Sequence, residues 1–327
     1  MKRRKLALLL AACLALGGCA AVRDPLPEST IIPGTDPVLP AVNEEGRRIR
    51  EEATLWFRFL DEPYLAPETR AIVQLTGQSY EMALLSALFS GPGTQYVELN
   101  SLFPEGTRVL SVSRQGRALL VTVSREFLNS LPDEPEDWQS DAAWRIEMPL
   151  RRRLAMQSLV ATITENCDVD EVIVLLEQNA DQATSSRLPR SWFLDENSDG
   201  LTGPQTRDDS CLLTPGVAGE AIMTRWLERD WQRLYLYVSS TDAISGEDRP
   251  AYRDFVTAMQ DLPPLMAFAC TGCSVSMDGL ETTLSVQAQI RQANGQMRSL
   301  EARILRLRRD SGLWKIGMSS LISWLEE

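Results

Sequence analysis

Two short runs in the first half of the chain, residues 109–113 and 119–123, alternate between apolar and polar side chains. Alternation with a period of two is typical of a strand that buries one face. Arg114-Gln115-Gly116 separates the two runs, and glycine readily adopts the backbone conformations that tight turns need. The pattern therefore predicts a β-hairpin, around which the neighbouring elements can be placed.

Further strands and helices are predicted on both sides of this hairpin. Alternating apolar residues predict strands that begin near Ala53 and near Ala71, and helical spacing predicts helices over residues 79–90 and 145–166. A continuous apolar run, residues 172–176, predicts a buried strand. The order strand, strand, helix, hairpin, helix, strand predicts an α+β fold in which helices pack on a mixed β-sheet.

Several sequence blocks in this region carry a resemblance to a known family. Besides the hairpin, they are ALLSALFSGPG at residues 83–93, LFPEGT at 102–107, VSREF at 123–127 and LVATITENCDVDEV at 159–172. Together they resemble the GerM domain, which occurs in lipoproteins of sporulation, spore germination and the cell envelope. The resemblance covers about residues 53–178 and implies a scaffold or assembly role, because GerM domains are related in fold to the ring-building motifs of sporulation channels.

The chain departs from the GerM pattern in two places. An acidic insertion occupies residues 131–144, and the last strand, at 171–177, continues into Gln-Asn-Ala-Asp where a tight glycine turn would be expected. Both departures concern loop geometry.

The second half of the chain has a different order of elements. After a connector without a hydrophobic period, apolar stripes predict helices over residues 218–239 and 248–261. Four strands are then predicted, with a hairpin turn at Asn294-Gly295, over residues 268–277, 282–291, 297–307 and 313–324. This order, helices followed by an antiparallel meander, resembles the cone-shaped NTF2-like (cystatin-like) fold. The resemblance rests on the order of the elements alone. Members of that fold use the cone as a pocket or as an interface.

The N-terminal residues predict export and a lipid anchor. A basic stretch, residues 2–5, precedes an apolar run at 6–16 that is too short to span a bilayer as a mature helix. Leu16-Gly17-Gly18-Cys19 resembles a bacterial lipobox, which implies that Cys19 is lipidated and becomes the first mature residue. The alternative is an ordinary signal peptide with an incidental cysteine. Since two or three acyl chains give stable anchoring, we expect the protein on the extracytoplasmic face of the cell membrane.

These predictions divide the chain into five segments. They are a lipoprotein signal peptide at residues 1–18, the lipidated Cys19 with a proline-rich linker at 19–52, the GerM-like domain at 53–178, a connector loop at 179–216, and the NTF2-like α+β domain at 217–327. The length beyond Cys19 suits two domains of about 150 residues each. The proline spacing of the linker favours an extended, semi-rigid stalk.

The chain is acidic, with a formal net charge of -12 that becomes -16 when the four basic residues of the signal peptide are removed. Such a chain has no overall attraction for nucleic acid, which is therefore not an expected partner, and membrane binding is left to the lipid. Arginines cluster at residues 151–153 and 303–309. Solvated faces of a helix and a strand are the favoured interpretation of these clusters.

Cysteine usage fits an exported protein. Cys13 is removed with the signal peptide, and Cys19 carries the lipid. Four cysteines remain, which could form two disulfides in any of three pairings: Cys167, Cys211, Cys270 and Cys273. The last two have the spacing of a redox motif, but such a motif normally begins a helix, and here it precedes strand-like sequence. Disulfides or free thiols are therefore favoured over a redox site. A zinc site is the least favoured interpretation, because the chain has no histidine that could complete a mixed cysteine–histidine ligand set.

The connector contains a candidate calcium loop. Asp195, Asn197 and Asp199 place oxygen side chains at alternate positions, and Gly200 is the sixth residue, where a calcium loop turns sharply. Thr206 stands where an EF-hand would place its bidentate glutamate. Because Asp, Asn and Gly are also common in ordinary turns, a turn-rich loop without metal is the favoured interpretation. A structural calcium ion is the alternative, and no other cofactor is expected.

No histidine occurs anywhere in the chain. This excludes Ser-His and Cys-His pairs and every histidine general base. A Ser-Lys dyad in the mature chain could use only Lys315, which lies in an apparent strand. Carboxylates alone could hydrolyse glycosides, but the acidic residues concentrate in predicted loops at 133–137 and 195–209. We therefore expect no enzymatic activity.

The combined prediction is a membrane-anchored, extracytoplasmic lipoprotein whose GerM-like domain has a non-catalytic scaffold role in sporulation, germination or cell-envelope processes. Its expected partners are the membrane, through the anchor, and envelope proteins or further copies of itself. The alternative is a lipoprotein whose second domain binds a small molecule or a peptidoglycan fragment. Aromatic residues could line such a cavity if they left it unfilled; they are Trp226, Trp231, Tyr235, Tyr237, Phe255 and Trp314. A cell-wall enzyme is a third hypothesis.

Overall fold

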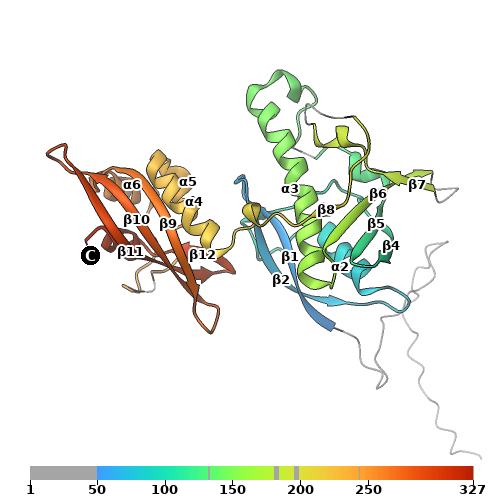
Figure 1. The fold of residues 1–327 in the computed structure, drawn as a ribbon, viewed down its shortest axis with the longest axis horizontal. Coiled ribbons are helices and arrows are strands. Elements are labelled where there is room, and N and C mark those ends of the chain that lie inside the picture. The colour runs from blue at the N-terminus through green and yellow to red at the C-terminus, as the bar shows by residue number, and fades with distance from the viewer. Residues whose placement is uncertain (1–49, 132, 180–183, 195–198, 243, 327) are drawn as a thin grey trace, which may run out of the picture. The chain divides into compact units, whose positions relative to one another are not determined.

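The structure is a computed structural model that describes residues 50–131, 133–179, 184–194, 199–242 and 244–326 (Figure 1). Cys19, Asp195 and Asn197 lie outside the described residues. The described chain is α+β, as predicted, and its strands form several sheets.

The chain's first described strands form a small antiparallel sheet. Strand β1 (Arg50–Phe59) pairs along its length with β2 (Leu65–Val73), and its last two residues pair with β3 (Leu99–Asn100). On one face of β1, Leu55, Phe57 and Phe59 are buried. Trp56 and Arg58 on the opposite face are buried as well, because helices cover that side.

The hairpin predicted at the centre of the first half is confirmed. Strands β4 (Val109–Gln115) and β5 (Ala118–Val123) pair antiparallel around a turn in which Gly116 has a φ of 61°. Strand β6 (Glu171–Asn179) lies parallel to β5, while β7 (Thr184–Arg187) and β8 (Gln205–Thr206) pair antiparallel with β6. This sheet is mixed, and it is separate from the β1–β3 sheet, whereas the sequence pattern predicted one sheet for both groups of strands.

Helix α3 (Ala142–Asn166) packs against β1, β6 and α2 (Tyr80–Phe89), as Figure 1 shows. It begins three residues earlier than predicted because the Asp141 side chain accepts hydrogen bonds from the amides of Ala143 (2.7 Å) and Trp144 (3.2 Å) and so caps the first turn. The apolar residues on its inward side are buried, among them Met156, Leu159, Val160 and Ile163.

Polar residues of α3 take the place of a neighbouring strand along β1. Ser158 donates to the carbonyl of Trp56 (2.6 Å), and Thr162 accepts from the Trp56 amide (3.1 Å). Asn166 accepts from the Thr54 amide (2.9 Å) and donates to the Thr54 carbonyl (2.7 Å). Because β3 reaches only the end of β1, these side chains satisfy backbone groups that would otherwise be buried without partners.

Short 3-10 helices lie in the loops of this half. They are η1 (Arg125–Leu128), η2 (Trp138–Ser140), η3 (Arg190–Phe193) and η4 (Asp209–Cys211). Trp192 of η3 is buried and stacks on Phe127, with ring centroids 5.0 Å apart. Part of the predicted connector therefore packs on the core of the first half.

The second half begins with two helices where one was predicted. Helix α4 (Pro215–Glu228) ends at Arg229, whose φ of 57° lies in the left-handed region, and Asp230 caps α5 (Trp231–Leu236) by accepting from the Arg233 amide (3.2 Å). Helix α6 (Tyr252–Asp261) follows.

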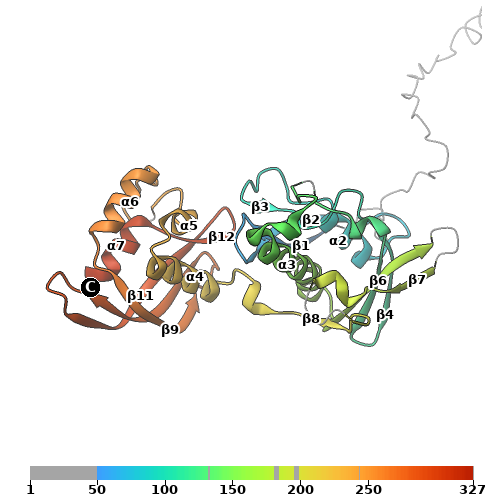
Figure 2. The same ribbon diagram turned by 90° about the horizontal axis from the view of Figure 1, so that it is seen from above.

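An antiparallel meander completes the chain. Its strands are β9 (Leu265–Val275), β10 (Glu281–Arg291), β11 (Met297–Asp310) and β12 (Leu313–Ile316), in the order β12-β11-β10-β9. The fourth predicted strand is wrong beyond Ile316, since residues Met318–Glu326 form helix α7. Helix α4 packs on β9 (Figures 1 and 2). The NTF2-like assignment of this part stays a prediction.

Aromatic side chains fill the space between the helices and the meander. Trp226 and Trp324 meet edge to face with centroids 5.7 Å apart, and Tyr237 and Phe255 are fully buried. Gly219 of α4 lies so close to β10 that an added Cβ would come within 2.3 Å of Leu284. A methyl group at that position would therefore force the Leu284 side chain to move.

Residues 50–326, with the gaps given above, lie within one compact unit, and the predicted domain boundaries remain predictions. Glu62, in the turn between β1 and β2, is wholly buried and accepts from Arg225 (2.9 Å) and Tyr237 (3.0 Å). Arg233 lies 3.4 Å from its second oxygen. Lys315 on β12, which is also buried, donates to both carboxylate oxygens of Glu98 at 2.7 Å.

Candidate functional site

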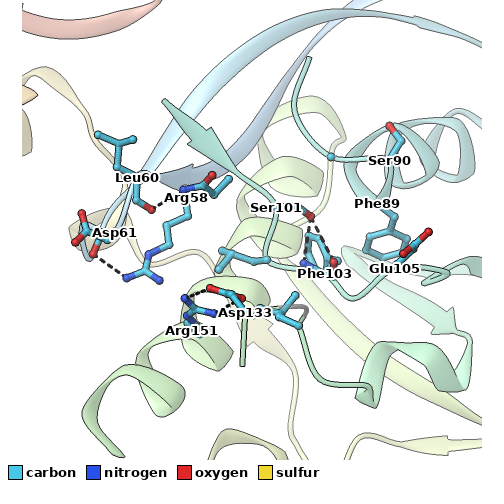
Figure 3. Close-up of a pocket in the computed structure, with 14 residues that line it drawn as sticks. Arg58, Leu60, Asp61, Phe89, Ser90, Ser101, Phe103, Glu105, Asp133 and Arg151 are labelled. Atoms are coloured by element: carbon cyan, nitrogen blue, oxygen red, sulfur yellow. Dashed lines mark hydrogen bonds and ion pairs between the residues drawn. The ribbon is translucent and has the colours of Figure 1, made fainter. Parts of the chain in front are cut away.

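A groove of about 610 Å³ lies in the first half of the chain (Figure 3). The end of β1 and the turn after it, the end of α2, the segment after β3, the loop before α3 and one turn of α3 all contribute side chains. The lining residues used below are Arg58, Leu60, Asp61, Phe89, Leu102, Phe103, Glu105, Leu131, Asp133 and Arg151.

Two of the sequence blocks that carry the GerM resemblance meet at this groove. The first contributes Phe89, Ser90 and Gly91 at the end of α2. Arg70 holds this end in place by donating to the carbonyls of Ala87 (3.0 Å) and Gly91 (2.8 Å). Gly91 has a φ of 81°, which glycine adopts without strain, so the chain can turn away from the helix at this point.

The second block forms a tight turn. Thr107 donates through its hydroxyl (2.7 Å) and its amide (3.2 Å) to the carbonyl of Pro104, and Gly106 has a φ of 82°. The turn leaves Glu105 exposed at the groove and directs Phe103 inward. Phe103 packs edge to face on Phe89 with centroids 4.8 Å apart, which joins the two blocks.

A chain of alternating charges runs along the groove. Arg58 donates to both carboxylate oxygens of Glu147, one of them at 3.1 Å, and to the carbonyls of Asp61 (2.8 Å) and Glu62 (3.0 Å). Arg151 donates to Glu147 (2.7 Å) and forms a bidentate pair with Asp133 (2.9 and 2.7 Å). The guanidinium of Arg151 also lies 4.8 Å from the Trp144 ring centroid. Both arginines are thus engaged by the protein itself.

The carboxyl groups of this chain stay ionised. Burial acts to raise the pKa of Glu147, but hydrogen bonds from Arg58 and Arg151 outweigh it and hold that pKa below its usual value. The hydrogen bonds from Arg151 also lower the pKa of Asp133. A general acid at neutral pH needs a raised pKa, so these two groups supply charge and shape, not protons.

The arginine cluster at residues 151–153 is not simply a solvated face. Arg151 takes part in the charge chain, and Arg152 lies 5.3 Å from the Trp192 ring centroid and 3.9 Å from Glu134. Arg153 is exposed, as predicted. The one sequence signal for this arrangement was the helical spacing of four between Glu147 and Arg151.

Of the predicted site residues that the structure describes, none lines this groove. Asp199 is exposed, and within the described ranges no three metal-ligating side chains gather. The calcium loop stays a prediction because Asp195 and Asn197 are outside those ranges. Among residues 50–326 with their gaps, none of the helices combines the length and apolar character needed to cross a bilayer.

The candidate disulfide residues are free thiols in the structure, and their pairing stays a prediction: Cys167, Cys211, Cys270 and Cys273. Burial raises the pKa of Cys167 and of Cys270 to about 11, and that of Cys211 to about 12. A redox motif works through a lowered thiol pKa, so the raised value at Cys270 argues against that role.

A comparison with family models supports the resemblance seen in the sequence. The model named Germane, described as "Sporulation and spore germination", matches residues 59–181. No curated protein sequence is significantly similar to the chain.

Among solved structures, the tandem GerMN domains of the sporulation protein GerM from Bacillus subtilis align over 51% of this chain with 16% identity and a TM-score of 0.32. This chain spans 49% of that structure's length. The first GerMN domain alone aligns over 49% of this chain and 98% of its own length, with 16% identity and a TM-score of 0.28.

A Delta 5-3-ketosteroid isomerase from Mycobacterium sp. aligns over 31% of this chain and 88% of its own length, with 15% identity and a TM-score of 0.25. The family match, which covers the β4–β5 hairpin, α3 and the residues of the groove other than Arg58, is the informative comparison. On this match, the chain contains a Germane domain at residues 59–181.

Proposed function

We propose that this GerM-domain protein is an extracytoplasmic lipoprotein, anchored through Cys19, with a non-catalytic assembly role in sporulation or spore germination. The family match supports the process, and the basic, apolar and Leu-Gly-Gly-Cys sequence at the N-terminus supports export and lipidation. Acyl chains on Cys19 would hold the protein at the membrane and raise its local concentration toward partners.

The observation that carries the assembly role is the groove. Two blocks of the domain sequence build it, and the arginines and carboxylates along it are held in ion pairs that offer shape and charge without acid–base chemistry. Such a surface suits recognition of another protein. The filled interior of the second half also favours this role over a ligand cavity there, since Trp226, Tyr237, Phe255 and Trp314 are buried among their neighbours.

Ligand binding is the second candidate function, and we place the ligand in the groove of the first half instead of in the second domain. A volume of about 610 Å³ lies within the 300 to 1,000 Å³ typical of small-molecule sites. A small molecule or a peptidoglycan fragment could therefore enter the groove of the Germane domain.

In-cell photo-crosslinking separates these functions. A photo-activatable residue would replace Leu131 at the groove in one variant, and Met277, which is fully exposed in the turn after β9, in a matched control. The assembly role predicts links to envelope proteins or to a second copy from position 131 but not from position 277. Equal linking from both positions, or a small molecule that co-purifies and protects position 131, would contradict it.

The anchor is tested by a separate variant. Cys19→Ser removes the thiol that would carry the lipid, so the protein should move from the membrane fraction to the soluble extracytoplasmic fraction. An unchanged membrane fraction would contradict lipidation at Cys19.

A further inference from the structure

The cations of the groove are already paired with groups of the protein itself, which use most of their N–H donors. Arg58 is only 3% exposed, and its guanidinium donates to Glu147, Asp61 and Glu62. Arg151 is occupied by Glu147 and Asp133. A phosphate or carboxylate entering the groove would compete with the carboxylates of Glu147 and Asp133, which already neutralise both guanidiniums. The two arginines therefore organise the groove and offer little net attraction for negative charge.

The charges left to face a partner are negative. Three carboxylates line the groove, those of Asp61, Glu105 and Asp133, and its two guanidiniums also pair with a fourth, that of Glu147, so carboxylates outnumber the arginines of the groove. Glu105 is exposed, and no cation of the described residues pairs with it. The side chain of Asp61 is 73% exposed and lies only loosely, at 3.8 Å, from Arg233.

The wall between these acids is apolar. Leu60, Phe89 and Leu131 line the groove and are each half-buried, so part of their surface meets solvent. Leu102 and Phe103 close the floor beneath them. Burying this surface under a partner would be favourable, whereas a fully hydrated ion would gain nothing from it.

We propose that the groove binds a segment of a partner protein that carries a lysine or arginine beside apolar side chains. The apolar residues of the segment would cover Leu60, Phe89 and Leu131, and its cation would lie near Glu105 and Asp61. This inference rests on the proposed assembly role and adds the chemistry of the partner. Charge complementarity excludes an acidic segment and disfavours pairing of this acidic chain with itself through two identical grooves.

A peptide series tests this selectivity on the full mature chain with Cys19→Ser. The probe is a fluorescent eight-residue peptide of alternating lysine and leucine, and its counterpart replaces every lysine by glutamate. Fluorescence anisotropy should show saturable binding of the lysine peptide only. Because exposed charges act weakly, Glu105→Gln should weaken binding by about 3-fold, and the double variant Glu105→Gln with Asp61→Asn by about 10-fold.

A matched variant controls for general attraction to an acidic protein. Glu136→Gln removes an exposed carboxylate from the same region that does not line the groove, and it should leave the affinity unchanged. Leu131→Ser should weaken binding at least as much as Glu105→Gln. Equal losses for Glu136→Gln and Glu105→Gln, or equal binding of the glutamate peptide, would overturn the proposal.

The photo-crosslinking result distinguishes this failure from that of the proposed function. Links from position 131 together with no selectivity for the lysine peptide would leave the assembly role standing and reject the partner chemistry. Selective binding of the lysine peptide without links in cells would support the partner chemistry and reject the assembly role.

Discussion

At the residue scale, the backbone of Trp56 shows how a helix can replace a strand. Its carbonyl and amide face α3, where Ser158 and Thr162 satisfy both groups at 2.6 and 3.1 Å. Without the hydroxyl of Thr162, the Trp56 amide would be buried without a partner, and that state costs about 1 to 3 kcal/mol.

Thr162→Val should therefore lower the free energy of unfolding by about 2 kcal/mol. Thr164→Val on the same helix is the control, because the Thr164 hydroxyl bonds only to its own helix, at the carbonyl of Val160 (2.9 Å). The control should change stability by less than about 0.5 kcal/mol. Urea denaturation of both variants gives the comparison, and equal losses would mean that the bond to β1 contributes nothing.

Sequence patterns predicted the apolar partners of such residues better than the polar ones. The helical spacing of Ser158, Thr162 and Asn166 was visible, but an inward stripe is recognised by its apolar members. Arg58 and Glu147 are 89 positions apart, so nothing local indicates that they meet. The groove was therefore not predicted, although two blocks that form it were identified.

At the element scale, local signals predicted the hairpin and the position of α2. Ser79 accepts from the Met82 amide at the start of α2, as its side chain predicts. Pairing between distant strands has no such signal, which is why the separate β1–β3 sheet was missed. The break between α4 and α5 was missed because Arg229 is a good helix former that here takes a left-handed backbone.

The conformation of Arg229 makes a stabilising substitution available. Arg229→Gly removes the strain of a side chain at a φ of 57°, and we expect a gain of about 0.5 to 1 kcal/mol after the greater flexibility of the unfolded glycine is included. Leu227→Gly, two residues earlier and inside α4, should instead cost about 1 kcal/mol or more. Thermal unfolding of both variants tests the opposite signs, and a loss for Arg229→Gly would contradict the assignment of strain.

At the scale of the whole molecule, Glu62 links the turn after β1 to α4 and α5. The carboxylate is wholly buried and is compensated by Arg225, Arg233 and Tyr237. Removing one partner from a buried ionic group leaves the others unpaired, and such losses are about 3 to 5 kcal/mol.

Glu62→Gln should accordingly destabilise the protein by about 3 kcal/mol. Glu228→Gln is the matched control, since Glu228 also pairs with Arg225 (3.0 Å) but is 51% exposed, and surface pairs contribute only about 0 to 1 kcal/mol. Chemical denaturation followed by tryptophan fluorescence measures both. Similar losses of stability in the two variants would show that the buried ion pair of Glu62 contributes no more than the exposed pair of Glu228.

The same cluster predicts a loss of stability in alkali. Burial, followed by the charge of Glu62, raises the pKa of Tyr237 in the folded protein. The folded state then binds the phenolic proton more tightly than the unfolded state, so this contribution is complete below about pH 10 and declines as the pH rises above it. Tyr237→Phe should flatten the fall in stability between about pH 10 and 11.5. If the free energy of unfolding falls with pH equally steeply in the variant, groups other than Tyr237 cause the loss of stability.

The ion pair between Lys315 and Glu98 has a consequence for how this protein would be observed. The sequence contains two other lysines, Lys2 and Lys5, and both lie in the segment expected to be removed on export. In a mature chain that begins with an acylated Cys19, Lys315 would be the last primary amine on a side chain, and it is 5% exposed with both oxygens of Glu98 against it. Reagents that acylate surface amines would leave the folded protein unlabelled, and surveys that detect surface proteins by such labelling would not detect it.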